Sequence, residues 1–185
     1  MNTISINSPE FHQQLFKIDH ATARATQKNG CQYCKGTLHI ANYPRIGFGV
    51  PANQAPYYSL RFSFCCADCR RRHTPASIRF FGRLRYVATI FILLSALRFS
   101  PSELRCIRLA NKFDVFTSLA TWKRWITWWR VDFPLTRQWI DLKAHFPSST
   151  SSIPRALLKQ LTYSTLATRL QQALMLLSLP PKSVP

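Results

Sequence analysis

The chain has 185 residues, enough for one domain or two small ones, and its hydrophobic fraction of 46% is enough for a real core. Lysine and arginine number 25 against 7 aspartate and glutamate residues, which gives a formal net charge of +18. A surplus of this size argues against most small-molecule enzymes. It favours a polyanionic partner, nucleic acid first and an anionic membrane second.

The first ten residues are polar, with neither a basic start nor an apolar run, so we expect no export signal. The six cysteines are then expected in a reducing compartment, where closely spaced pairs more often bind metal than form disulfides. We therefore expect a cytoplasmic protein, associated with the nucleoid if the source is bacterial. The apolar run 86–97 would span roughly 18 Å as a helix, against about 30 Å for a bilayer core. It is predicted to be a buried core helix, and no membrane partner is expected.

Residues 1–30 are predicted to hold a short helix and a linker. Ser8 is the expected N-cap, with Pro9 at the first helical position, and Asn29 and Gly30 close the segment. The apolar residues between these signals support one or two amphipathic turns. They are Phe11, Leu15, Phe16 and Ile18.

Residues 31–81 are predicted to form a zinc ribbon. The predicted ligands are two Cys-x2-Cys pairs, the arrangement that a tetrahedral zinc ion needs: Cys31 with Cys34, and Cys66 with Cys69. Gly36 is expected to supply a positive φ after the first pair. Strands are expected at 37–40 and, from an alternating apolar pattern, at 58–64.

The Zn²⁺ is expected to be structural, because a catalytic zinc usually has three protein ligands and a neighbouring acid or base. The only nearby acid is Asp68. Cys65 is an alternative to Cys66, but neighbours in a strand face opposite sides, so only one can easily join the site. Cys66 is preferred because its spacing matches the first pair. His39 and His73 are alternative ligands.

Residues 82–146 are predicted to form a helical domain with helices near 84–99, 103–113, 119–130 and 135–145. The second and third of these are expected to form a helix-turn-helix, with Ser102 as the N-cap of the second. The second helix is predicted to have a broad apolar face that holds Cys106, Ile107, Leu109, Ala110 and Phe113. It is predicted to pack on the third helix through Leu104, Ile107, Ala110 and Phe113. The inner face of the third is predicted to hold Trp122, Trp125, Ile126 and Trp129.

Two sets of residues are predicted to contact DNA. The outer side of the third helix, the expected recognition helix, carries Ala120, Lys123, Arg124, Thr127 and Arg130. Phosphate contacts are expected from the arginines after the ribbon, namely Arg70, Arg71, Arg72, Arg79, Arg83 and Arg85. A linker at 147–152 then leads to an amphipathic helix at 153–179, through which a homodimer is predicted. The sequence leaves open whether this helix packs on the same domain.

The order of these parts resembles the DNA-binding region of insertion-sequence transposases and the small accessory proteins of mobile elements. The resemblance is carried by Cys31-x2-Cys34, by 65–75 (CCADCRRRHTP) and by 121–129 (TWKRWITWW). It implies binding to double-stranded DNA and a transposase or another mobile-element protein as partner. It implies no chemistry, because the last glutamate is Glu103 and the later aspartates lie in helical sequence, unlike the Asp-Asp-Glu set of a transposase nuclease.

The predicted fold class is α+β, mainly α, with a small zinc ribbon followed by a helical bundle that contains the helix-turn-helix. The predicted function is a zinc-stabilised double-stranded DNA-binding protein, a transposition accessory or regulator and not an enzyme. The alternative is a zinc-ribbon scaffold that binds RNA or a partner protein.

Overall fold

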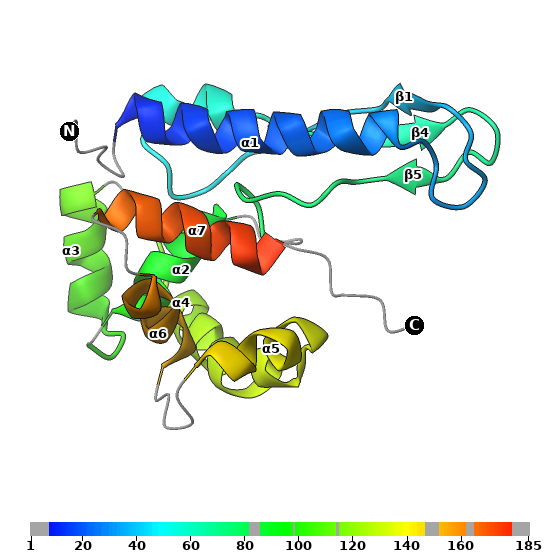
Figure 1. Ribbon diagram of the computed structural model, residues 1–185. Helices are drawn as coiled ribbons and strands as arrows, with labels where there is room; N and C mark the ends of the chain where they lie inside the picture. The colour runs from blue at the N-terminus through cyan, green and yellow to red at the C-terminus, as the bar shows by residue number, and fades with distance from the viewer. Residues whose placement is uncertain are drawn as a thin grey trace.

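The computed structural model describes residues 8–81, 86–97, 99–113, 115–146, 152–161 and 165–178. A long N-terminal helix and a small β ribbon form one layer, and the other helices gather in a second layer beside it (Figure 1). The α-helices are α1 (Pro9–Lys28), α2 (Ala88–Ala96), α3 (Glu103–Phe113), α4 (Leu119–Thr127), α5 (Arg137–Leu142), α6 (Ile153–Gln160) and α7 (Leu166–Ser178). The strands are β1 (Leu38–Ile40), β2 (Tyr43–Pro44), β3 (Leu60–Arg61), β4 (Phe64–Cys66) and β5 (Arg72–His73). The shorter turns are η1 (Ala52–Tyr58), η2 (Trp128–Asp132), η3 (Phe133–Leu135) and η4 (Lys143–His145). This is the mainly helical α+β fold that the sequence predicts.

Helix α1 begins as predicted, with Ser8 as N-cap and Pro9 in the first turn, but it runs for 20 residues rather than one or two turns. The Ser8 side chain accepts a hydrogen bond from the backbone N–H of Phe11 at 3.4 Å. The buried face continues past the apolar residues through Asp19 and Ala23. Because a charged residue, Asp19, occupies a core position in mid-helix, the apolar stripe in the sequence is shorter than the buried face of the helix.

The ribbon is a three-stranded antiparallel sheet in the order β1-β4-β5, with a separate β2–β3 pair. Leu38 lies opposite Cys66, and Phe64 lies between Ile40 and His73. The strand predicted at 58–64 is broken into η1, β3 and β4. Its expected polar face is absent, because Ser63 is buried along with the apolar residues.

A buried ion pair joins α1 to the segment that follows β5. Arg79 Nε lies 2.7 Å from Asp19 Oδ2, and the two side chains are 0% and 1% exposed. Asp19 Oδ1 also accepts the backbone N–H of Ile78 at 2.7 Å. The guanidinium donates further hydrogen bonds to the carbonyl oxygens of Tyr57 and Leu60. All these polar groups therefore have partners in the interior, as buried charges require.

An aromatic cluster between α2 and α4–η2 forms the centre of the helical layer. The ring of Phe91 lies 5.5 Å from that of Trp125 and 5.3 Å from that of Trp129. Trp122 is fully buried, and its indole N–H donates to the carbonyl oxygen of Leu94 at 3.0 Å. The predicted inner tryptophan face is thus confirmed, and so is the burial of the apolar run in α2. Among the described residues, no helix combines the length and the apolar character that crossing a membrane needs.

Helix α3 has the predicted bounds, but two of the residues predicted to pack against the third helix, Leu104 and Ile107, lie outside the core. Leu104 and Ile107 are 60% and 59% exposed. The tryptophan face of α4 is filled by α2 instead, so α3 meets the core through the partly buried Cys106 and Leu109. The packing expected of a helix-turn-helix is therefore not formed by these side chains.

The single helix predicted at 153–179 is two helices, α6 and α7, and this part of the prediction is also wrong. Both pack on the same core as α2 and the tryptophans. Their buried residues include Leu157, Leu158, Leu170, Ala173, Leu174 and Leu177. The apolar faces expected to serve a homodimer are thus used within the chain. The predicted linker lies outside the described residues except for Ser152.

Candidate functional site

Four thiols converge at the end of the ribbon. Their Sγ atoms all lie within 4.8 Å of one another, and they belong to Cys31, Cys34, Cys66 and Cys69. The Sγ–Sγ distance is 3.5 Å both for Cys31–Cys69 and for Cys34–Cys66. Thiolates around a zinc ion at about 2.3 Å form a tetrahedron with edges of about 3.8 Å, so the cluster has the size of a zinc site. These four residues form a group that can hold a metal ion, in a β setting like a zinc-ribbon knuckle.

The two cysteine pairs lie in turns of matching geometry. In the first turn, the backbone N–H of Cys31 donates to the carbonyl oxygen of Gly36 at 2.9 Å. In the second, the N–H of Cys66 donates to the carbonyl oxygen of Arg71 at 3.0 Å. Each turn spans five residue steps and begins at the first cysteine of its pair. Because the turns fold alike and face each other, their thiols meet at one point.

Gly36 serves the site through its small size rather than through its backbone conformation. The left-handed residues are those that directly follow each pair, Lys35 with φ of 63° and Arg70 with φ of 59°, so the positive φ predicted for Gly36 is wrong. A Cβ at Gly36 would lie 1.9 Å from Asp68 Oδ2 and 3.2 Å from Cys66 Sγ. The exposed carboxylate can turn away, but the sulfur is held by the cluster. Glycine therefore lets the two turns approach each other closely.

The structure distinguishes Cys66 from Cys65. Cys66 is completely buried with its sulfur in the cluster. Cys65 lies opposite His39 in the sheet, and its sulfur is directed to the carbonyl oxygen of Arg70, 3.5 Å away. The exposed His39 therefore lies away from the thiols. Cys66, which the sequence favours over Cys65 as a ligand, is thus the one whose sulfur lies in the cluster.

His73 lies beside the cluster. Its Nε2 is 3.2 Å from Cys31 Sγ, and the ring is buried. Whenever Cys31 is a thiolate, which can only accept, Nε2 must carry the hydrogen and donate it to the sulfur. His73 is thus a hydrogen-bond partner of a ligand, the kind of contact that orients a metal site from outside.

The thiols of the cluster differ in pKa. Burial acts to raise the pKa of Cys31, but the backbone N–H groups of Cys34 and Tyr33, together with neighbouring thiols, lower it to about 6. At Cys69 the backbone N–H of Arg71 acts to lower the pKa, yet burial and the surrounding thiols raise it to about 12. One thiol therefore ionises readily and another resists, since adjacent thiolates repel each other. A soft divalent cation removes this repulsion, and four thiolates in a tetrahedron suit Zn²⁺.

We expect the affinity for zinc to fall as the solution is acidified, because metal and protons compete for the thiolates. With its pKa of about 6, Cys31 keeps its thiolate above that pH and loses it below. With its pKa of about 12, Cys69 must release a proton when metal binds at neutral pH. A competition titration with a zinc-binding dye at about pH 8, 7, 6 and 5 should show a steadily rising Kd. Calorimetry in buffers of different ionisation enthalpy should show proton release. A Kd independent of pH would contradict thiolate ligation.

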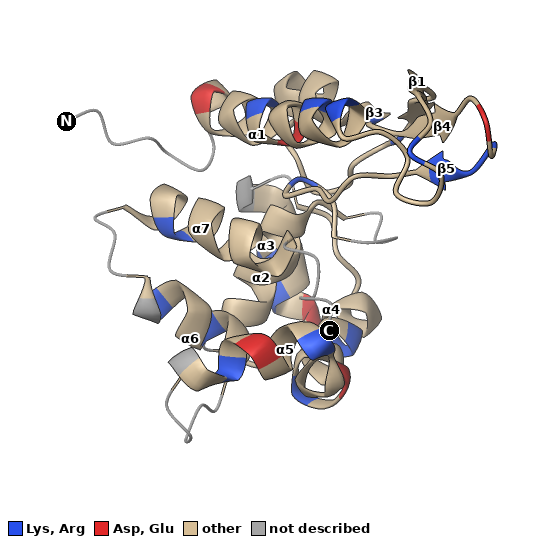
Figure 2. Ribbon diagram, turned by 45° about the vertical axis from the view of Figure 1, so that its right-hand side comes forward, with Lys and Arg blue, Asp and Glu red and all other residues tan. Residues whose placement is uncertain are grey.

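The end of the ribbon that holds the four thiols, called the knuckle end below, carries exposed positive charge. Arg70, Arg71 and Arg72 are all exposed, and Figure 2 shows basic residues around β5. Within the described residues, none of them forms an ion pair. The Arg71 guanidinium lies 4.3 Å from the ring centre of Tyr33, which is 57% exposed. Tyr33 is not among the site residues predicted from the sequence, although an aromatic residue between the two cysteines of a Cys-x2-Cys pair could have indicated it.

The remaining arginines predicted to contact phosphate fall into two groups. Arg79 is fully buried and paired with Asp19, so its predicted contact is wrong. The physical reason is that its guanidinium already has acceptors in the interior. Arg83 and Arg85 lie outside the described residues.

The predicted DNA-facing residues of the third helix are all exposed on α4 and η2. They are Ala120, Lys123, Arg124, Thr127 and Arg130. Lys123, Thr127 and Arg130 line a groove, whereas Arg124 does not. A recognition helix needs a protruding surface to enter a major groove, so this half of the face differs from the expected shape. Its contact with DNA stays a prediction.

Comparison with known proteins yields no match: no family model, no curated protein and no solved structure matches the chain. The resemblance to transposase DNA-binding regions therefore stays a prediction. What the structure establishes is a mainly helical α+β chain with a four-cysteine group that can hold a metal ion.

Proposed function

We propose that the chain is a zinc-stabilised nucleic-acid-binding protein whose knuckle end contacts the phosphates of double-stranded DNA. The observation that carries the proposal is the exposed run Arg70–Arg72, which starts one residue after a cysteine of the cluster. A bound zinc ion fixes the turn and therefore the direction of this run. The net charge of +18 supplies the long-range attraction to a polyanion.

The zinc has a structural role in this proposal. Four cysteine thiolates fill all four positions of a tetrahedral ion and leave none for a substrate or water, which distinguishes structural from catalytic zinc sites. The chain would then act by binding rather than by catalysis. Its resemblance to mobile-element proteins supports a place beside a transposase, as an accessory protein or regulator.

The test is the salt dependence of duplex binding. If 6–10 phosphates are neutralised, affinity should fall by about 10³–10⁵ between about 50 and 200 mM salt. Arg71→Ala should weaken binding to all sequences alike and reduce the salt slope by about one. Lys159→Ala, which removes one exposed charge from α6, is the matched control and should leave the slope unchanged. A salt-independent affinity, or equal effects of the two variants, would overturn the proposal.

A scaffold that binds a partner protein is the second candidate. Leu104 and Ile107 on α3 are 60% and 59% exposed, and Phe99 just before this helix is 62% exposed. Exposed apolar residues that gather on one element fit protein contact better than nucleic-acid contact. Retention of duplex binding by a Leu104→Ser, Ile107→Ser variant would separate this surface from the DNA-binding one.

A further inference from the structure

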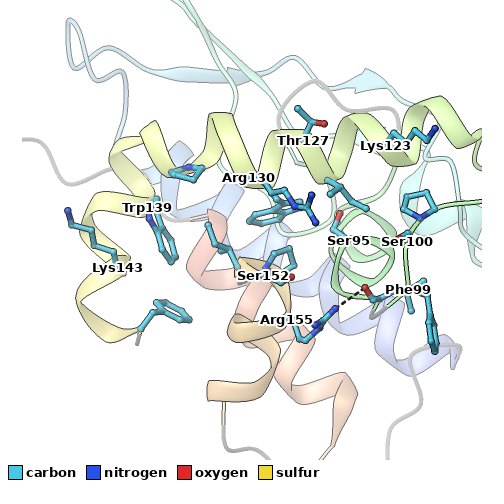
Figure 3. A pocket seen from close by; sticks show the side chains of 18 of the residues that line it. Ser95, Phe99, Ser100, Lys123, Thr127, Arg130, Trp139, Lys143, Ser152 and Arg155 are labelled. Atoms are coloured by element: carbon cyan, nitrogen blue, oxygen red, sulfur yellow. Dashed lines mark hydrogen bonds between the residues drawn. The ribbon is translucent and has the colours of Figure 1, made fainter. Parts of the chain in front are cut away.

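A groove of about 1200 Å³ lies among the C-terminal end of α2, the α4–η2 helix, the α5–η4 segment and the start of α6 (Figure 3). Sites for small molecules usually measure about 300–1000 Å³. The groove therefore suits an extended ligand better than a compact one.

Positive charge is distributed along this groove. Lys123, Arg130 and Lys143 line it, and no acidic residue does so in the described part of the chain. Figure 3 shows Lys123 and Lys143 toward opposite ends, with Arg130 between them. Lys123 and Arg130 are seven residues apart, which corresponds to about 10 Å along a helix. Arg155 has another task, because it donates to the carbonyl oxygen of Leu97 at 3.0 Å at the end of α2. The three other cations are available to a chain of negative groups.

Aromatic rings line both ends of the groove. Trp139 and Phe146 line one end of the groove with their ring centres 5.4 Å apart. Phe99, which is 62% exposed, lines the other end. Rings interleaved with cations are how proteins bind unpaired nucleotides, since each base stacks on a ring while its phosphate meets a positive charge.

Two buried polar groups at the groove have no hydrogen-bond partner among the described residues, the hydroxyl of Ser95 and the indole N–H of Trp129. The two residues are 7% and 3% exposed. Buried polar groups nearly always have partners, and an indole N–H can only donate. Neither atom is accessible to solvent, so a ligand in the groove would reach the indole N–H only if neighbouring side chains moved. Trp129 lies in the π-helical turn η2, a kind of turn that often occurs at functional sites.

We propose that this groove binds an unpaired nucleic-acid strand, with phosphates on Lys123, Arg130 and Lys143 and bases stacked on Trp139 and Phe99. The proposal rests on the proposed function in taking nucleic acid as the partner, but it assigns a second site, separate from the knuckle end. An acidic peptide would satisfy the cations and leave the rings unused.

The test compares labelled DNA probes with the full-length protein loaded with zinc. The probes are a blunt duplex of about 20 base pairs, the same duplex with an unpaired tail of about 10 nucleotides, the tail alone, thymidine monophosphate and a polyglutamate peptide. We expect the tailed duplex to bind about tenfold more tightly than the blunt one. Arg130→Ala with Lys143→Ala should remove this advantage, so that the variant binds the tailed and the blunt duplex with equal affinity. Arg124→Ala, on the same helix but outside the groove, should keep the advantage.

Stacking is tested separately at Trp139. Trp139→Leu should reduce the preference for the tailed duplex over the blunt one, and Trp139→Phe should keep most of that preference. If the role of Trp139 were purely structural, the circular dichroism spectra of both variants would show lost helicity. Equal binding of tailed and blunt duplexes, with a normal salt slope, would overturn the groove proposal and leave the proposed function standing. Absence of salt-dependent binding to any DNA would overturn both. Polyglutamate or the mononucleotide binding as tightly as the tail would also overturn the proposed strand site.

Discussion

Replacing Cys66 with serine is expected to abolish stoichiometric zinc binding and to unfold the ribbon, whereas replacing Cys65 should leave both intact. The two residues are adjacent in β4, yet only Cys66 places its sulfur in the four-thiol cluster. A serine hydroxyl stays protonated near neutral pH and is a poor zinc ligand, so three thiolates would remain. The neighbouring substitution makes the same chemical change on the other side of the sheet, which makes it the matched control.

The effect should be large because the ribbon has little else to hold it together. Its strands are two or three residues long, and its core consists of few buried side chains besides the cysteines. They are Ala23, Leu38, Phe62 and Phe64. Modules of this size usually depend on a metal or on disulfides. The apparent binding free energy of structural zinc in zinc-finger peptides is about 10–16 kcal/mol at pH 7, more than such a core can replace.

Zinc content measured by emission spectroscopy, together with amide hydrogen exchange, would check this prediction. We expect about one zinc per chain in the wild type and in Cys65→Ser, and none in Cys66→Ser. Exchange should become fast in β1, β4 and β5 of Cys66→Ser and stay slow in α2 and α4, whose core is separate. Zinc retained by Cys66→Ser and lost by Cys65→Ser would show that the ligand assignment is reversed.

The metal site could be predicted from the sequence because its information is local. Two residues between paired cysteines are enough to form a turn, and the second pair repeats the first. The tryptophan face was equally accessible, because Trp122, Trp125 and Trp129 recur at helical spacing. The start of α1 was readable from Ser8 and Pro9 for the same reason. The helix start and the tryptophan face depend on residues within two helical turns of one another, and each cysteine pair is equally local, although Cys34 and Cys66 are 32 residues apart.

The predictions that the structure contradicts concern which helix packs against which apolar face. Periodicity shows that α3 has an apolar side, but it cannot show that α2 already fills the tryptophan face of α4. Leu104 and Ile107 were therefore assigned a contact that they do not make. The leucine pattern after 153 likewise continues across the break between α6 and α7. The segment Thr-Tyr-Ser-Thr at 162–165 was the available sign, since threonine and serine compete with the helix for backbone hydrogen bonds.

The Asp19–Arg79 ion pair could not be predicted from the sequence, for a different reason. The partners are 60 residues apart, and aspartate and arginine are rarely buried, so neither residue type nor spacing indicates the contact. Arg79 was instead grouped with the exposed arginines that follow the ribbon. In the structure the pair joins α1 to the chain between the ribbon and α2, and it adds to the packing of Phe11 and Leu15 of α1 in the core of the helical layer.

Asp19→Asn is expected to lower the free energy of unfolding by about 3–5 kcal/mol, because removing one member of a buried ion pair leaves the other charge uncompensated. The amide would keep the volume of the side chain but would place an NH₂ group where an oxygen now accepts. Arg79 Nε, the hydroxyl of Ser77 and the N–H of Ile78 all donate to this carboxylate. At least one of these donors would lose its acceptor.

Asp141→Asn is the matched control, since it makes the same substitution in an exposed pair. Asp141 lies 3.8 Å from Arg137 Nε, and the side chains are 31% and 51% exposed. Exposed ion pairs contribute about 0–1 kcal/mol to the free energy of unfolding, so the control substitution should change it by no more than this. Urea unfolding followed by tryptophan fluorescence would measure both variants. A loss at Asp19 no larger than that at Asp141 would contradict the prediction.

A double substitution separates the charge effect from the packing effect. Arg79→Met and Asp19→Leu should each be destabilising alone, but the two combined should be less destabilising than the sum of these single changes, because no buried charge remains. The recovery should be partial, since the carbonyl oxygens of Tyr57 and Leu60 would still lose their donor. Phe16 and Phe62, whose rings lie 4.8 and 5.2 Å from the Arg79 guanidinium, would pack against the methionine instead. Full additivity of the single changes would mean that the two charges do not stabilise each other, and the link between the layers would then rest on packing alone.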